Sequence, residues 1–176
     1  MKLLFICTFI AAGMSFLCPT YAEGHLADYS AVPIDSIGCD SIPALNRGVI
    51  HFVNSNMKKK VGRGECWDVA AEALNLLGAT WDHNYVFGKE VDYQTQCIYP
   101  GDIIQFEGVT VKYEKNGRHY TETMGHHTAI IYEVTGKGEY FLAHQNTGFG
   151  GRKVDISRID LKTITSGKFK IFRPVK

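Results

Sequence analysis

The stretch VGRGECWDVAAEALNLLGATW, residues 61–81, predicts a helix that begins at a cysteine. Two glycines precede Cys66, and apolar residues recur at helical spacing over residues 69–77. Gly78 is a natural end for such a helix. The amides at a helix N-terminus are unpaired and carry a partial positive charge, so a thiol placed there ionises more readily. The stretch therefore marks Cys66 as a candidate nucleophile.

Two acidic neighbours of Cys66, Glu65 and Asp68, oppose this ionisation, although acids are also common in a first helical turn. A positively charged partner is therefore required, and a histidine can supply it by pairing with the thiolate. The alternative interpretation of Cys66 is a buried structural cysteine, because free cysteine is among the most buried residue types.

Helical patterns come first in the chain and strand patterns follow. Residues 44–57 carry apolar side chains at helical spacing, whereas residues 79–98 indicate loops and short pieces. Runs of β-branched and aromatic residues then predict strands, and GRHYTETM between the first two predicts a polar connection or a hairpin. The strand candidates are YPGDIIQFEGV, HHTAIIYEV, GEYFLAHQN and KFKIFRPVK. This order predicts an α+β fold in which helices pack on an antiparallel sheet.

Histidines in two of these strands are the candidate partners of the cysteine. Successive strand residues point to opposite faces, so His126 and His127 lie on different sides of the sheet. In the following strand, His144 and Asn146 share a face and can point together toward a histidine on the adjacent strand. A third group that fixes the orientation of an imidazole is what a cysteine–histidine pair requires.

Three segments, in this order, resemble the NlpC-type and CHAP enzymes of the papain-like superfamily of cysteine peptidases and amidases. They are GRGECWDVAAEAL, YPGDIIQFEG and HHTAIIYEVTGKGEYFLAHQN. The resemblance implies a papain-like domain with its nucleophile at a helix N-terminus, in which Cys66 is the nucleophile and His127 the base. It implies that His144 is the orienting third residue, that Asn146 is a second polar support, and that Asp102 belongs to a structural turn.

The chain departs from the family pattern at two places: GECWD replaces the Asp-Cys-Ser of many NlpC-type enzymes, and no Glu-x-Asn occurs near His144. The subfamily and its substrate therefore stay open. His126 is an alternative base. A zinc site formed by Cys66, His127 and His144 is chemically possible, but no metal-binding spacing supports it.

Residues 1–22 have the pattern of a secretory signal peptide, with a short apolar run and cleavage expected after Ala22. A membrane anchor and a lipid-anchored Cys18 are the alternatives. Cleavage leaves an irregular segment, residues 23–43, and one papain-like domain, residues 44–176. It also leaves three cysteines, so a pairing of Cys39 with Cys97 would keep Cys66 free, although the sequence does not establish that pairing.

Composition limits the classes of partner. The cleaved chain has 18 basic and 18 acidic residues, so electrostatics gives it no reason to bind nucleic acid. We expect a secreted protein, extracellular or periplasmic, without a membrane-spanning helix after cleavage and without a metal or organic cofactor. The predicted function is a cysteine amidase or peptidase, and the resemblance implies peptidoglycan or a peptide as substrate. The alternative is a non-catalytic binding module for cell wall or protein on the same fold.

Overall fold

The computed structural model describes Cys39 and residues 41–176. The predicted signal peptide and most of the irregular segment that follows it lie outside the described residues. Within the described part, none of the helices has the length and apolar character needed to cross a membrane.

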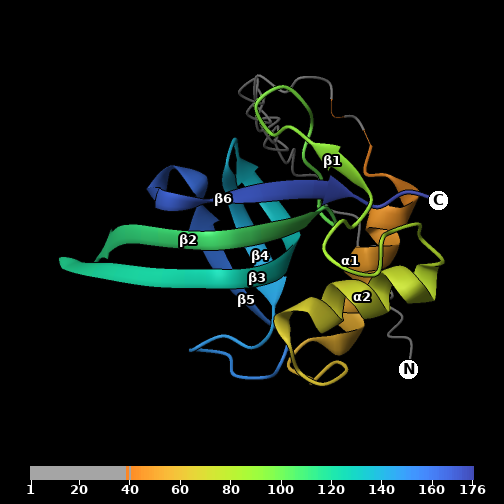
Figure 1. The fold of residues 1–176 in the computed structure, drawn as a ribbon, viewed down its shortest axis with the longest axis horizontal. Helices are drawn as coiled ribbons and strands as arrows, with labels where there is room; N and C mark the ends of the chain where they lie inside the picture. Colours follow the sequence, from red (N-terminus) through yellow and green to blue (C-terminus); the bar gives the residue numbers. More distant parts are fainter. Residues whose placement is uncertain (1–38, 40) are drawn as a thin grey trace, which may run out of the picture. The chain divides into compact units, whose positions relative to one another are not determined.

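Two helices come first, as the sequence predicts (Figure 1). Helix α1 spans Ala44–Asn56 and helix α2 spans Cys66–Leu77. The backbone amide of Glu65 donates to the Asp68 carboxylate at 3.0 Å, which satisfies one of the amides that a helix start leaves unpaired. At the other end Gly78 adopts a left-handed conformation with φ of 61°, and its N–H bonds back to the last turn.

Six strands form one antiparallel sheet in the order β1-β6-β2-β3-β4-β5. Their bounds are β1 Lys89–Val91, β2 Ile103–Lys115, β3 Arg118–Gly136, β4 Glu139–His144, β5 Asp155–Asp160 and β6 Ile164–Arg173, with a 3-10 turn η1 at Leu161–Thr163. The sequence did not predict β1 or β5. The GRHYTETM segment is the first part of β3, because a two-residue Asn116–Gly117 turn pairs it with β2 in a long hairpin.

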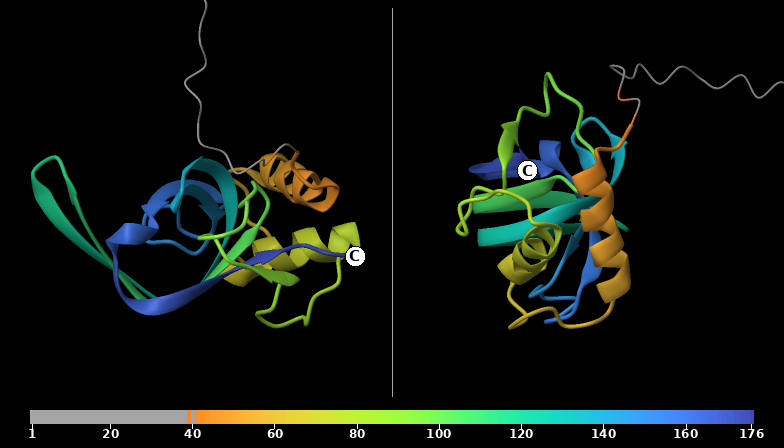
Figure 2. Two further views of the ribbon diagram at one scale, coloured as in Figure 1. Left: turned by 90° about the horizontal axis from the view of Figure 1, so that it is seen from above. Right: turned by 90° about the vertical axis from the view of Figure 1, so that its right-hand side faces the viewer.

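The sheet separates two apolar clusters. On one face both helices pack against the sheet, and Ile130 and Ala143 belong to that cluster. Ala129, Ile131 and Leu142 belong to the cluster on the other face. Figure 2 shows that the sheet curves on the side away from the helices. The alternation of β3 therefore decides which side chains face the helices.

Two features join the start of the described chain to the sheet. Cys39 and Cys97 form a disulfide, so Cys66 is the free cysteine among the described residues. Asp102 is fully buried and accepts hydrogen bonds from Asn46 Nδ2 at 2.7 Å and from Arg173 Nη2 at 2.8 Å. These contacts are those of a structural residue, because they tie α1 and β6 to the turn that begins β2.

Candidate active site

Cys66 is the first residue of α2 and is partly buried. The segment before it contains Gly62 and Gly64 at positive φ, and Gln145 binds that segment from the end of β4. The buried Gln145 amide accepts from Val61 N at 3.1 Å and donates to Glu65 O at 2.8 Å. The start of the cysteine helix is thus fixed against the strand that carries His144. Sequence reasoning missed Gln145, although it stands between two residues that were singled out.

The sulfur of Cys66 lies against strand β3. Its Sγ is 4.0 Å from the backbone oxygen of His126, which belongs to the peptide unit that joins His126 to His127. The fixed dimensions of a peptide place the next Cα roughly 3 Å from that oxygen, so Sγ lies within about 7 Å of His127 Cα. The structure therefore brings the backbone of both neighbouring histidines close to the sulfur.

His127 and His144 are brought together as the sequence suggested. His127 Nε2 lies 2.9 Å from His144 Nδ1, and His144 Nε2 lies 2.9 Å from the hydroxyl of Ser157 on β5. Burial lowers the pKa of His127 to about 4 and, together with the neighbouring His127, lowers that of His144 to about 3. Both imidazoles are therefore neutral near pH 7. The sequence offered no means of finding Ser157, because β5 itself was not predicted.

The alternation of β3 separates the two neighbouring histidines. His127 falls on the face of Ala129 and Ile131, which is opposite to the helices, and His126 falls on the helix face with Ile130. His126 Nδ1 lies 2.7 Å from the Glu107 carboxylate, and the Tyr85 ring meets the His126 ring edge-on at 4.0 Å. His126 is thus the imidazole on the helix side of the sheet.

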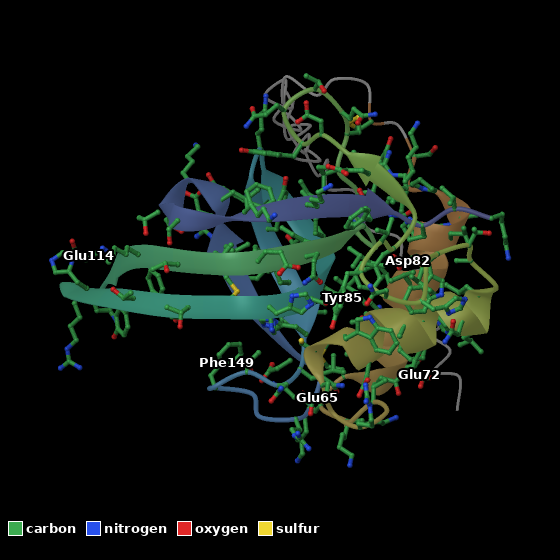
Figure 3. All side chains as sticks on the ribbon, viewed as in Figure 1. Glu65, Glu72, Asp82, Tyr85, Glu114 and Phe149 are labelled. Carbon is green, nitrogen blue, oxygen red and sulfur yellow. A yellow bond between two sulfur atoms is a disulfide. The ribbon has the colours of Figure 1, made fainter. Side chains whose placement is uncertain are left out.

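A groove opens beside the start of α2. It has a volume of about 410 Å³. Figure 3 labels two of its lining residues, Glu65 and Tyr85, beside this helix. The groove is lined by Arg63, Glu65, Cys66, Trp67, Asn84, Tyr85, His126 and Asn146. His126 is therefore the histidine that shares this groove with Cys66.

Asn146 lies in the groove but does not contact His127 or His144 through any hydrogen bond in the described structure. Its side-chain amide donates to Glu65 at 2.7 Å, and Arg152 pairs with the other Glu65 oxygen at 2.5 Å. These bonds tie the loop after β4 to the residue before Cys66. Phe149 on the same loop is exposed, and its ring lies 5.7 Å from the ring of His144.

Among the described residues, no group of three histidine, cysteine, aspartate or glutamate side chains is arranged to hold a metal ion. Cys66, His127 and His144 do not form such a group in this part of the chain. The site therefore contains a thiol and two kinds of imidazole. His127 and His144 are neutral near pH 7, and His126 is bound by the Glu107 carboxylate.

Comparisons with known proteins give one family and three likenesses. Residues 44–176 match the model of the AIM3/BBC1 cysteine proteinase-fold domain. A 148-residue stretch is 28% identical to altered inheritance of mitochondria protein 3 of Debaryomyces hansenii and covers 72% of this chain but 15% of that protein. The chain thus spans a small part of this curated relative.

Two crystal structures of Ly7917 also resemble the chain. The structure with the hydrolyzing product of MDP has 14% sequence identity and a TM-score of 0.48, and the match covers 73% of this chain and 62% of that one. The other has 15% identity and a TM-score of 0.44, over 72% of this chain and 62% of that one. At TM-scores below 0.5, neither likeness bears on the fold or on the function.

Proposed function

This chain belongs to the AIM3/BBC1 cysteine proteinase-fold domain family, and from that premise we propose that it is a cysteine hydrolase of amide bonds. Family membership supports the cysteine-proteinase fold and does not single out NlpC-type or CHAP enzymes. The proposed nucleophile is Cys66, the proposed base is His127, and the proposed orienting residue is His144.

One observation supports this proposal most directly: the 2.9 Å contact between His127 Nε2 and His144 Nδ1, next to the peptide unit against which Cys66 Sγ lies. A base needs a second group that fixes its tautomer, and His144 is placed to do this for His127. The Ser157 hydroxyl fixes His144 in turn. His127 is neutral near pH 7, so it has a lone pair with which to accept a proton.

The proposed reaction has two halves. The Cys66 sulfur, which lies against the backbone of β3 just before His127, attacks the amide carbon. His127 lies on the other face of the sheet, so in this proposal its imidazole reaches the sulfur around the edge of β3, accepts the thiol proton and gives it to the leaving amine as the C–N bond breaks. Water hydrolyses the resulting thioester with His127 as base and regenerates the thiol. The amide of Cys66, at the start of α2, is a candidate donor to the oxyanion. Asn146 acts indirectly in this scheme, because its contact with Glu65 holds the loop before the nucleophile.

We propose peptidoglycan, or a peptide, as the substrate and an extracytoplasmic site of action. The substrate proposal depends on the resemblance of the three sequence segments to NlpC-type and CHAP enzymes. The proposed site of action depends on the signal-peptide pattern of residues 1–22. The test is mass spectrometry of the fragments that the full chain releases from purified peptidoglycan and from a peptide library. We expect new amine or peptide termini with the unaltered protein and none with Cys66→Ala.

A specific observation favours the alternative, a non-catalytic binding module. Desolvation keeps His127 and His144 neutral near pH 7, although Asp155 raises the pKa of His144, so this pair brings no positive charge to the thiol in the resting state. If the unaltered protein and Cys66→Ala bind peptidoglycan equally well and neither releases fragments, the binding module replaces the hydrolase. His119→Gln, on the exposed hairpin, serves as the matched control for histidine replacement.

A further inference from the structure

A network of hydrogen bonds surrounds His126 on the helix face of the sheet. Its Nδ1 is bound by Glu107 at 2.7 Å, and its Nε2 lies 3.4 Å from the Gln105 amide nitrogen. Gln105 also donates to Glu107 at 3.0 Å and accepts from the buried Thr128 hydroxyl at 2.5 Å. The proposed mechanism uses none of these groups.

The network holds one ring in one orientation. Gln105 and Thr128 are nearly or fully buried, and burial of polar groups is costly unless they find partners. Their bonds fix the Glu107 carboxylate, and Glu107 then fixes the imidazole of His126. Burial raises the pKa of the Glu107 carboxyl, but hydrogen bonds from His126 and Gln105 lower this pKa by more. The Glu107 carboxylate is therefore ionised near pH 7.

His126 is also the histidine that lines the groove with Cys66. The other charged side chains of the groove already have partners: Arg63 pairs with Asp68 at 3.2 Å, and Glu65 pairs with Arg152. The neutral groups beside the ring are Tyr85 and Gln105. From β6, Lys168 lies across from Glu107 and lowers the pKa of that carboxyl further. In this groove, His126 is therefore the imidazole that lies with Cys66, and a carboxylate holds its ring.

We propose that His126, held by Glu107, is a positioning residue for Cys66: as an imidazolium it stabilises the thiolate across the groove. This inference rests on the proposed function, because it presumes that Cys66 is the nucleophile: the imidazolium favours loss of the thiol proton, which His127 accepts. Glu107 balances the imidazolium through Nδ1. His127 keeps its role as the base.

Alkylation of Cys66 by iodoacetamide, followed against pH, tests this proposal without a known substrate. The full chain is used with its disulfide intact, and the Cys66 peptide is quantified by mass spectrometry. We expect His126→Gln to raise the apparent pKa of the thiol, so that the rate at about pH 6.5 falls roughly threefold to tenfold while the rate at high pH is unchanged. His126→Lys restores the rate at low pH, because it restores the charge. His119→Gln leaves the profile unchanged.

The outcomes separate this inference from the proposed function. If His126→Gln leaves the profile unchanged while His127→Gln shifts it, the inference is overturned and the hydrolase proposal stands. If Cys66 alkylates with an ordinary midpoint near pH 8.5 in every variant, the inference is overturned too. The hydrolase proposal then depends on fragment release by the unaltered protein alone. A general loss of rate at all pH values in His126→Gln, without rescue by His126→Lys, indicates a structural role and also overturns the inference.

Discussion

Of the two histidines in the proposed mechanism, His144 is buried and His127 is partly buried, and their desolvation has a consequence at the scale of single residues. An imidazole that is desolvated in the folded state resists protonation, whereas the same imidazole in the unfolded chain titrates near pH 6.5. The pKa of His127 is about 4 in the folded state, and that of His144 is about 3. Between these values and about pH 6.5 the unfolded chain binds more protons than the folded protein, so stability rises with pH.

We therefore expect the urea midpoint of the protein to fall as the pH is lowered from about 6.5 towards 4, and to be independent of these two groups above about 6.5. Replacing both histidines, in His127→Gln/His144→Gln, should flatten this part of the profile. His119→Gln, whose side chain is exposed, should keep the slope of the unaltered protein. An equal slope in the double variant would mean that other groups cause the acid sensitivity.

At the scale of elements, the turn that begins β2 is fixed by its contact with helix α1. Gly101 has φ of 91°, and a Cβ placed there would lie 2.4 Å from the backbone oxygen of Asn46. The sequence alone showed Pro100, Gly101 and Asp102 as a turn before a strand. It did not show that glycine is required because a helix backbone passes next to it, since Asn46 is more than fifty positions away in the sequence.

Gly101→Ala should therefore destabilise the protein by about 3 kcal/mol or more, because it adds both a strained backbone and a contact with backbone that cannot move aside. Gly136→Ala is the matched control: a Cβ there meets only the Glu139 side chain at an ordinary 3.7 Å. We expect a change of less than about 1 kcal/mol for the control. Chemical denaturation measures both, and equal values for the two variants would contradict the argument.

At the scale of the whole molecule, the disulfide closes a loop of 58 positions that contains α1, α2 and β1. The sequence left this pairing open, because three cysteines can be joined in more than one way. Chain folding brings Cys39 and Cys97 together and leaves Cys66 free at the groove. The cross-link thus restrains the unfolded chain around the part of the fold that presents the proposed nucleophile.

Cys39→Ser/Cys97→Ser should lower the free energy of unfolding by about 2–4 kcal/mol, as expected for a disulfide that closes a loop of this length. The pH profile of Cys66 alkylation under native conditions should stay unchanged, because His126 and Glu107 do not depend on the disulfide for their contacts. A changed profile in the folded double variant would instead show that the disulfide holds the groove in shape.

The sequence by itself determined the local features of this protein. Helical spacing and Gly78 gave the bounds of α2, and the start of that helix at Cys66 followed from the glycines before it. Strand alternation placed His126 and His127 on opposite faces. These features depend on residues that are close together in the sequence, so local sequence patterns are enough to predict them.

Tertiary structure decided which of these side chains meet. The pairing of β2 with β3 brings Glu107 to His126, and the end of β4 brings His144 to His127. Helix α2 packs on one face only, so the groove contains Cys66 with His126, whereas His127 lies partly buried on the other face. Sequence patterns give the alternation of a strand but not the face that a helix will cover, because that choice depends on packing between segments far apart in the chain.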